Sequence, residues 1–417
     1  MSIRTDELST CISCGLCLND CPTFRILGDE ADSPRGRIAL MRNLVASRDA
    51  PSDSTVEHLE ACLVCRACET ACPSGVPFGR LMEGAREIVR ERAPEPRFAR
   101  SLRGIGLGVV AHPGRLELLT RVLALYQRTG LQRLARRLAL IPTPLRTADA
   151  LAPARIDAPF RLEDAAAFGE ERRHVAFFAG CVMRTVFGET DRATVRLLRR
   201  TGCRVSVPRD QACCGALHTH AGEGEGARRL ARRNIEAFER SGASAVVVNA
   251  AGCGAQLKAY GSVLRDDPAW RQRAEHFATT VRDVTEFLVG NLTAPPRPRP
   301  GLRVAYQDAC HLAHGQRVRA QPRALIRSIP GVTLVELGDG ERCCGSAGIY
   351  NLTHPGVAGE LGQQKAAAIE RARPDVVVSA NPGCLLQISA HLSRSGSRIR
   401  TMHIIDLLDE GYEKILS

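Results

Sequence analysis

Apolar residues follow two different patterns along this chain of 417 residues. In the C-terminal part, short apolar runs at 174–181, 245–253, 303–310 and 376–384 alternate with amphipathic stretches at 190–200, 226–240 and 359–371. Strands that alternate with helices in this way predict parallel α/β units. The N-terminal part carries helical patterns instead, one beginning at Pro34 and one near Leu59, and these predict a helical domain.

The C-terminal pattern occurs twice. Each half has a cysteine after its first strand, a Cys-Cys-Gly triplet, a cysteine after a later strand, and a closing strand and helix at 281–288 or 402–408. The first cysteine and the triplet are separated by 31 and 32 residues, and the triplet glycine and the last cysteine by 37 and 38. This agreement predicts two units of related fold, arranged about a pseudo-twofold axis.

Each half places four cysteines where open α/β sheets bind ligands, at the carboxyl ends of the strands. The candidate metal sites are Cys181, Cys213, Cys214 and Cys253 in the first half, and Cys310, Cys343, Cys344 and Cys384 in the second. Adjacent cysteines suit two metals of a cluster better than one small tetrahedral ion. A further iron–sulfur cluster, structural zinc and free buried thiols all remain open. Cys203 has no counterpart in the second half, so we expect it to pack in the core.

Eight further cysteines form two copies of the motif C-x₂-C-x₂-C-x₃-C-P. The copies are Cys11, Cys14, Cys17 and Cys21 before Pro22, and Cys62, Cys65, Cys68 and Cys72 before Pro73. This run holds [4Fe–4S] clusters in two-cluster ferredoxins, where the fourth cysteine ligates the other cluster. We therefore assign Cys11, Cys14, Cys17 and Cys72 to one cluster, and Cys62, Cys65, Cys68 and Cys21 to the other. Zinc sites favour paired knuckles, so four cysteines in one short run favour the clusters.

The length of the chain predicts two or three domains. We expect a helical two-cluster ferredoxin domain at 1–95, a basic helical connector and linker at 96–173, and Cys-Cys-Gly units at 174–295 and 296–417. The fold class is therefore α+α/β. The N-terminus has no apolar leader and no stretch is long enough to span a bilayer. Seventeen cysteines in such a chain indicate metal ligation rather than disulfides, and a cytoplasmic location.

Positive charge is concentrated before the first Cys-Cys-Gly unit. Residues 86–147 contain thirteen arginines and four glutamates, a balance of +9 out of a net +12 for the chain. The stretches 116–126 and 131–140 are helical in period, and Leu131, Leu134 and Leu138 share one face. Such helices either pack on a neighbouring domain or partner subunit, or lie on an anionic membrane surface as a peripheral contact. Without aromatic interleaving or a binding motif, we expect no nucleic-acid partner.

Four polar residues near the cysteines have two interpretations each. Arg35 and Arg37, in the insert between the two ferredoxin motifs, could offset the negative charge of a cluster or lie in solvent. His311 and His314, which follow Cys310, could act as ligands or proton carriers, or could be packed structural histidines.

Together, the two ferredoxin motifs, the two Cys-Cys-Gly units, the segment 32–37 and the strand-turn 306–316 resemble the glycolate oxidase iron–sulfur subunit family. The wider superfamily includes the iron–sulfur subunit of anaerobic glycerol-3-phosphate dehydrogenase and the catalytic subunits of heterodisulfide reductase. Heterodisulfide reductases end each unit in C-x-x-C, whereas this chain has Gln256 and Gln387 at those positions. The departure argues against a noncubane cluster of the kind that cleaves disulfides.

The resemblance implies an oxidoreductase complex in which this chain supplies electron transfer and no catalytic residue. A partner subunit would oxidise a 2-hydroxy acid at FAD, and this chain has no GxGxxG turn for a nucleotide of its own. Electrons would pass singly through two [4Fe–4S] clusters to a membrane quinone or similar acceptor. Alternatives are a D-lactate or glycerol-3-phosphate dehydrogenase subunit, a catalytic disulfide reductase, and a scaffold with zinc in its C-terminal half.

Overall fold

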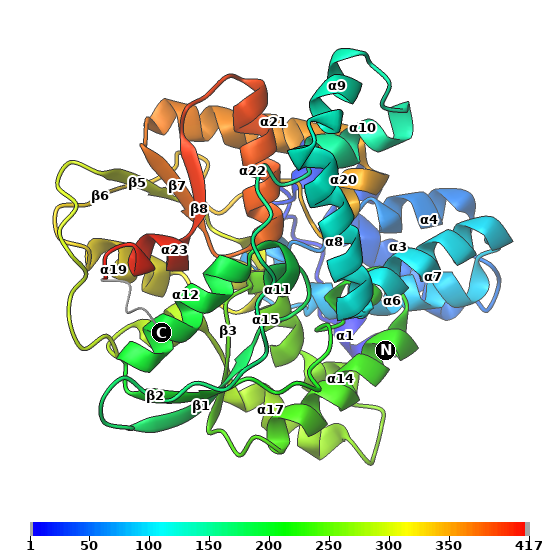
Figure 1. Cartoon of the computed structure of the whole chain (residues 1–417). Coiled ribbons are helices and arrows are strands. Elements are labelled where there is room, and N and C mark those ends of the chain that lie inside the picture. The colour runs from blue at the N-terminus through cyan, green and yellow to red at the C-terminus, as the bar shows by residue number, and fades with distance from the viewer. Residues whose placement is uncertain (1–2, 413–417) are drawn as a thin grey trace.

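A computed structural model describes residues 3–412 of the chain. Within this range all strands follow a helical segment and a helical connector, as Figure 1 shows. The N-terminal segment consists of α1 (Thr5–Ser9), α2 (Pro22–Leu27), the 3₁₀-helix η1 (Glu30–Asp32), α3 (Pro34–Ala46), α4 (Asp53–Glu60), α5 (Ala67–Thr70) and α6 (Phe78–Arg92). The α+α/β class predicted from the sequence is confirmed.

Local sequence signals explain where the N-terminal helices begin. The hydroxyl oxygen of Ser33 accepts a hydrogen bond from the Gly36 amide and caps α3, and Pro34 occupies its first turn. Ser52 caps α4 in the same way. The prediction of a helix starting near Leu59 was wrong, because α4 starts at Asp53 and ends at Glu60. The serine cap, which the apolar pattern did not reveal, sets that boundary.

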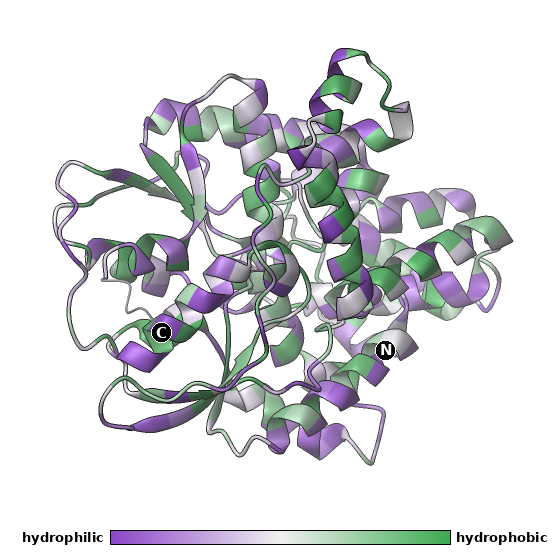
Figure 2. Ribbon diagram, viewed as in Figure 1, coloured by the Kyte–Doolittle hydropathy of each residue, from purple (hydrophilic) through white to green (hydrophobic). Residues whose placement is uncertain are grey.

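The connector contains α7 (Arg97–Ala111), α8 (Pro113–Arg128), α9 (Leu131–Arg137) and α10 (Thr143–Ala150). Leu116 of α8 is buried against the first α/β unit, but most apolar side chains of these helices are exposed. Figure 2 shows hydrophobic residues along α8 as well as in the inner strands. Among the described residues, no helix has the length and apolar character needed to cross a membrane.

The first α/β unit is a four-stranded parallel sheet in the order β2-β1-β3-β4. Its helices connect the strands along the chain. Its elements are β1 (Arg173–Phe178), α11 (Val182–Val186), α12 (Gly188–Arg200), β2 (Cys203–Ser206), α13 (Ala216–His220), α14 (Gly224–Glu239), β3 (Ala245–Val248), α15 (Ala251–Lys258), α16 (Tyr260–Val263), α17 (Arg271–Thr280), β4 (Val281–Asp283) and α18 (Val284–Leu288).

The second unit repeats this sheet in the order β6-β5-β7-β8, again with all strands parallel. Its elements are β5 (Arg303–Tyr306), the π-helix η2 (His311–Gly315), α19 (Ala320–Arg327), β6 (Thr333–Val335), α20 (Tyr350–Thr353), α21 (Pro355–Ala372), β7 (Val376–Ser379), α22 (Pro382–Arg394), β8 (Arg400–His403) and α23 (Ile404–Asp409). The identical strand order agrees with the repeat read from the sequence.

The two units pack on each other through equivalent elements. Helix α12 contacts α23, and its counterpart α19 contacts α18, the counterpart of α23. The amide of Ala251 donates to the Ala380 carbonyl at 2.9 Å, and the ring of His403 contacts the Asn249 carbonyl at 2.8 Å. These contacts join the segments that follow β3 and β7, so the cysteine-bearing ends of both sheets face the same interface.

Candidate functional site

The two ferredoxin loops have the same backbone course. Ser13 and Gly15 in the first loop adopt left-handed conformations, with φ of 58° and 83°. Val64 and Arg66, at the equivalent positions of the second loop, have φ of 51° and 66°. A β-branched residue such as Val64 is strained in this region by about 1–3 kcal/mol. Both loops therefore hold a turn that wraps their cysteines around a common point.

In the first loop the thiols lie near the surface. Cys14 is exposed, and Cys11, Cys17 and Cys72 are half-buried. Burial, together with the neighbouring thiols of Cys11, Cys21 and Cys72, raises the pKa of Cys17 to about 11. Cys72 from the second motif thus lies beside the first loop, the arrangement expected for exchanged fourth cysteines.

The second set of thiols is buried. Cys21, Cys62, Cys65 and Cys68 line one small cavity. Burial raises the pKa of Cys68 well above its ordinary value, with further contributions from Cys65, Cys62 and Cys21. Cys21 of the first motif therefore lies within the second set.

Buried Arg37 holds the polypeptide beside Cys21. Its guanidinium is 1% exposed, donates to the Thr23 hydroxyl at 2.8 Å, and forms an ion pair with Asp32 at 2.9 Å. The Thr23 hydroxyl in turn lies 3.3 Å from the Cys21 sulfur. Arg37 is thus a packed residue next to a candidate ligand, whereas Arg35 lies at the surface and pairs with Glu30.

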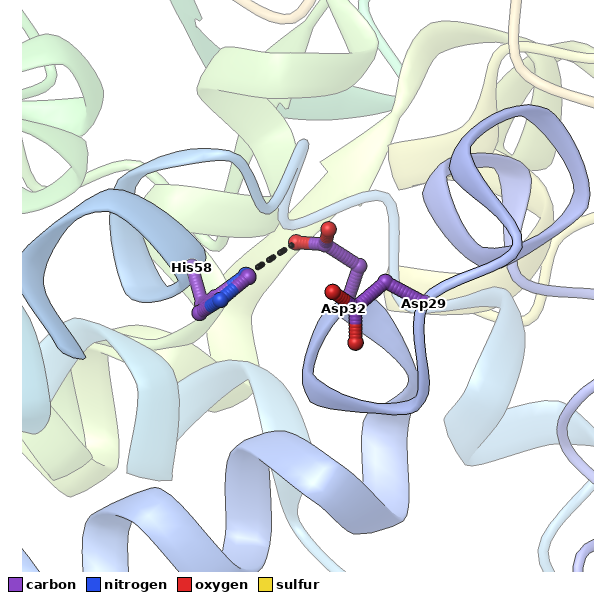
Figure 3. Close-up of side chains that lie close together, drawn as sticks. All are labelled: Asp29, Asp32 and His58. Atoms are coloured by element: carbon purple, nitrogen blue, oxygen red, sulfur yellow. Dashed lines mark ion pairs between the residues drawn. The ribbon is translucent and has the colours of Figure 1, made fainter. Parts of the chain in front are cut away.

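Asp32 also pairs with His58, through a distance of 3.2 Å to Nδ1 (Figure 3). Asp29 lies beside them, and its carboxylate accepts a hydrogen bond from the Ala31 amide at 2.8 Å. The three side chains are close enough to suggest a metal ion. However, the Asp32 carboxylate already forms an ion pair with Arg37. These side chains are therefore explained as structural contacts that hold η1, α3 and α4 together.

The first Cys-Cys-Gly unit brings its four thiols together. The sulfurs of Cys181 and Cys213 are 3.7 Å apart. The adjacent thiols of Cys213 and Cys253, and then burial, raise the pKa of Cys214. Two neutral side chains hold the backbone of the pair: Asn234 donates to the Cys213 carbonyl at 3.1 Å, and Tyr260 donates to the Cys214 carbonyl at 2.9 Å.

The second Cys-Cys-Gly unit also brings its four thiols together, and it lies against the ferredoxin loop. The thiols of Cys310 and Cys344, and then burial, raise the pKa of Cys343. Cys344 and burial do the same for Cys384. Burial raises the pKa of Cys65, and Cys310 is the largest charged contributor after it. The second ferredoxin set and the second unit are therefore neighbours.

Gln256 and Gln387, which replace the fifth cysteine of heterodisulfide reductases, are buried and hydrogen-bonded to protein groups. The Gln256 amide donates to the Thr219 hydroxyl at 2.9 Å. The Gln387 amide donates to the Ala358 carbonyl at 3.0 Å and accepts from Asn351 at 3.2 Å. Both side chains serve the packing of their own unit.

The two histidines after Cys310 join the second unit to the ferredoxin segment. His311 Nε2 lies 3.0 Å from the Val64 carbonyl, and His314 Nδ1 lies 2.9 Å from the Thr70 hydroxyl. Burial lowers the pKa of His311 to about 4, so its ring is neutral near pH 7 and donates to the carbonyl. The sequence allowed both histidines to be packed structural residues. It could not identify their partners, which lie more than 240 positions away.

Cys203 lies in β2 with its side chain fully buried, as predicted for a core thiol. All seventeen cysteines are free thiols. Burial, with neighbouring thiols, raises the pKa of Cys17, Cys65 and Cys68, and neighbouring thiols, with burial, raise the pKa of Cys181, Cys214, Cys343 and Cys384. One thiol of each Cys-Cys-Gly unit, Cys213 or Cys344, has a lowered pKa because neighbouring thiols donate hydrogen bonds to it. Coordinated iron would stabilise such crowded thiolates. The donor sets therefore fit iron–sulfur clusters.

Three protein families match the chain, in the order of its structural segments. Residues 7–76 match a 4Fe-4S dicluster domain, and residues 98–152 match the linker region of the glycolate oxidase iron-sulfur subunit. Residues 175–258 and 304–389 each match a cysteine-rich domain. The predicted iron–sulfur cofactors and the repeated C-terminal unit are thereby confirmed.

Curated relatives match over almost the whole chain. A probable glycolate oxidase iron-sulfur subunit of Bacillus subtilis is 39% identical over 97% of this chain and 94% of its own length. The glycolate oxidase iron-sulfur subunit of Escherichia coli is 34% identical over 98% of this chain and 95% of its own. A fumarate reductase (CoM/CoB) subunit of Methanothermobacter marburgensis is 28% identical over 98% of this chain and 73% of its own. With this similarity running through both cluster loops, the connector and both cysteine-rich units, the chain belongs to the family of glycolate oxidase iron–sulfur subunits.

Proposed function

We propose that this chain is the electron-transfer subunit of a complex that oxidises glycolate or a related 2-hydroxy acid. The proposal is supported by near full-length similarity to glycolate oxidase iron-sulfur subunits, together with a cavity lined by Cys21, Cys62, Cys65 and Cys68 and a first loop in which Cys11 and Cys72 lie near Cys17. Such a subunit implies a partner catalytic subunit that removes the electrons from the substrate. We assign that role to an FAD-binding oxidase subunit.

Cys11, Cys14, Cys17 and Cys72 would hold one [4Fe–4S] cluster, and Cys62, Cys65, Cys68 and Cys21 the other. Clusters of this kind take up and release one electron at a time. The exposure of Cys14 and the burial of the second set support an order in which electrons enter at the first loop. Arg37 and Thr23 fix the backbone around Cys21, and Arg42 donates to the carbonyls of Leu8 and Cys11 at 2.9 Å.

The partner flavoprotein would dock over the first loop. Ile12 and Leu16, which flank Cys14, are 71% and 60% exposed, and Leu27 of α2 is also exposed. Large exposed apolar side chains around an exposed candidate ligand are typical of a surface that a partner covers. Docking there would bring a reduced flavin close to the first cluster.

The four cysteines of each Cys-Cys-Gly unit, Cys181, Cys213, Cys214 and Cys253, and Cys310, Cys343, Cys344 and Cys384, are candidates for a further cluster or metal. The hydrogen-bonded Gln256 and Gln387 favour electron transfer over disulfide cleavage at these sites. D-Lactate and glycerol 3-phosphate remain alternative substrates of the complex, because the partner subunit would select the substrate.

We assign a membrane quinone or similar molecule as the acceptor, reached from the inner face of the cytoplasmic membrane. The connector supports this assignment. Twelve of the large apolar side chains that are exposed among residues 3–412 lie between 98 and 145: Phe98, Leu102, Ile105, Leu118, Leu119, Val122, Leu125, Leu131, Leu134, Leu138, Leu140 and Leu145. Arginines are interleaved with them, and basic apolar helices of this kind bind anionic lipid surfaces.

The proposal is tested with the anaerobically purified complex. Glycolate should reduce the iron–sulfur centres, seen by electron paramagnetic resonance, only when the flavoprotein subunit is present. The isolated chain should contain about eight irons in its ferredoxin segment and no zinc there, since two cubanes hold four irons each. Zinc in place of iron, or reduction of a disulfide by the isolated chain at enzymatic rates, would refute the proposal.

A further inference from the structure

Each ferredoxin loop is held by one arginine at an equivalent point of its backbone. In the first loop, Nη2 of Arg42 donates to the carbonyls of Leu8 and Cys11, both at 2.9 Å. In the second loop, Nη2 of Arg86 donates to the Cys62 carbonyl at 2.5 Å and to that of the leucine three positions before it at 3.2 Å. Both arginines therefore place a guanidinium on the first cysteine of a motif, although one comes from α3 and the other from α6.

The two guanidinium groups lie in different surroundings. Arg42 is exposed. Arg86 donates further hydrogen bonds to the Glu60 carbonyl at 3.0 Å and, across the boundary to the first Cys-Cys-Gly unit, to the His220 carbonyl at 2.9 Å. Its Nε is buried and makes no hydrogen bond to a described group. Water therefore screens the charge of Arg42 but is largely kept from that of Arg86.

The charge of Arg86 has no carboxylate of its own. It forms no ion pair within residues 3–412. Two carboxylates lie near it, and each has another partner: Glu60 pairs with Arg90 at 2.6 Å, and Glu83 lies 3.3 Å from His220. The guanidinium of Arg86 therefore spends its donors on backbone carbonyls and keeps its positive charge beside the second set of cysteines.

Other arginines beside the loops are neutralised. Three of them form ion pairs with nearby carboxylates: Arg35 with Glu30 beside the first loop, and Arg37 with Asp32 and Arg66 with Glu69 beside the second. Arg42, like Arg86, has no ion pair among the described residues. The two loops thus share an unpaired cation at the same point and differ in how far that cation is removed from water.

We propose that the buried charge of Arg86 raises the reduction potential of the second cluster above that of the first; the inference rests on the proposed function. Reduction adds one negative charge to a cluster, and its potential depends on nearby charge and on exposure. Burial alone opposes that added charge, and a cation held out of water offsets the opposition more strongly than one in water. Arg86 thereby favours passage of one electron from the first centre, which is oxidised, to the second, which is reduced, with no bond formed or broken.

The test is an anaerobic redox titration of the full-length, iron-loaded chain, followed by electron paramagnetic resonance. In the wild type the second cluster should have the higher midpoint potential. A soluble dysprosium complex identifies the first cluster, because it should speed the spin relaxation of the centre beside exposed Cys14. Arg86→Gln should lower the ratio of reduced to oxidised second cluster about tenfold at a fixed potential, which is ~59 mV for a one-electron couple. The iron content should stay unchanged.

Two variants show whether buried charge is the cause. Arg86→Lys keeps the charge but loses part of the hydrogen bonding, so its second cluster should stay within about twofold of the wild-type ratio. Arg42→Gln, the matched control, should change the first cluster by about twofold or less, because water screens that site. The inference is overturned if Arg86→Lys shifts the potential as far as Arg86→Gln, or if Arg42→Gln shifts the first cluster equally. If Arg86→Gln takes up no iron, the wild-type titration decides, since a second cluster that titrates below the first contradicts the inference.

This experiment separates the inference from the proposed function. The titration uses dithionite and redox mediators and requires neither the flavoprotein nor substrate. If glycolate reduces the centres through the complex but Arg86→Gln leaves the potential of the second cluster unchanged, only the role of Arg86 fails. If the potential shifts as expected and glycolate never reduces the centres, the proposed function fails.

Discussion

The ring of His311 donates a hydrogen bond of 3.0 Å to the carbonyl of Val64. This bond holds Val64, which lies in the Cys62–Cys65 loop and has a strained left-handed backbone conformation. The donor comes from the second Cys-Cys-Gly unit, 247 positions later. Nearby, the Tyr350 hydroxyl donates to the Ala61 carbonyl at 2.9 Å. The second unit therefore holds the second cluster loop in shape, in addition to carrying its own cysteines.

Removing the His311 donor should loosen this loop. His311→Phe leaves the Val64 carbonyl without its partner, at a cost of about 1–3 kcal/mol. We expect faster release of iron to a chelator from the second cluster and little change in the first. The exposed His276 provides the control, since His276→Phe should not alter the rate. Equal release from both variants would show that the bond does not support the loop.

Serine substitutions should distinguish the exchanged ligand sets. Cys72→Ser is expected to disturb the cluster held by Cys11, Cys14 and Cys17, and Cys21→Ser the buried one, each lowering the iron content by up to about four atoms. Electron paramagnetic resonance of the reduced protein identifies which signal is lost. Cys203→Ser, in the core of the first unit, should retain all iron. Loss of the first cluster on Cys21→Ser would contradict the exchange.

Substitutions of the two arginines in the insert should affect the free energy of unfolding to very different extents. Arg37→Met breaks a buried ion pair and leaves Asp32 without its partner, so we expect a loss of about 3–5 kcal/mol in the free energy of unfolding. Arg35→Gln removes an exposed pair with Glu30 and should cost about 0–1 kcal/mol. Anaerobic urea denaturation measures both. Similar effects of the two substitutions would show that burial of Arg37 contributes nothing to stability.

Asp406 should make stability depend on pH. Burial raises its pKa from an ordinary 3.8 to about 7, and the carboxylates of Asp157 and Asp409 add to the rise. The folded state then binds more protons than the unfolded state between about pH 4 and 7, so the contribution of Asp406 to stability falls as pH rises through this window and is constant above it. Thr190 donates to its carboxylate at 2.9 Å and limits the rise.

Asp406→Asn isolates this effect from other titrating groups. The unfolding free energy of wild type minus that of the variant should decrease by roughly 2–4 kcal/mol between pH 4 and 7. Urea denaturation at several pH values, followed by circular dichroism, provides the measurement. Glu170→Gln at an exposed site should give a flat difference. A flat difference for Asp406→Asn would mean that its carboxyl titrates normally.

The connector should determine attachment to anionic lipid. Replacing Leu118, Val122 and Leu125 of α8 together by serine should abolish sedimentation of the complex with phosphatidylglycerol vesicles. Arg133→Gln should weaken it about fivefold, as expected for one charge near an anionic surface. Arg204→Gln, on the first unit, should have no effect. Unchanged sedimentation of the α8 variant would indicate that a protein partner covers these helices.

Much of the fold could be predicted because it follows from local patterns. The strand and helix alternation identified the parallel units, and the spacing of Cys181, Cys213 and Cys253 identified the repeat. The start of α4 was missed because it depends on the Ser52 cap rather than on apolar periodicity. The sequence showed an apolar face at Leu131 and Leu134, but only the structure shows that no other part of the described chain covers it.

The residues of the candidate sites also fall into those that the sequence predicts and those that only the structure reveals. The candidate ligands could be predicted from the sequence, because a cluster requires its cysteines to stand at particular spacings. The burial of Arg37 and the partners of His311 and His314 depend on segments distant in sequence.

The dependence of the second loop on His311 and Tyr350 has a consequence for biogenesis. Those residues are synthesised long after Cys62, Cys65 and Cys68, so a growing chain on the ribosome lacks the groups that close the buried pocket. The first set needs only Cys72 and neighbours such as Arg42. We therefore expect cofactor loading to be sequential, with the outer centre able to form first and the inner one only after the segment that carries His311 and Tyr350 has been made.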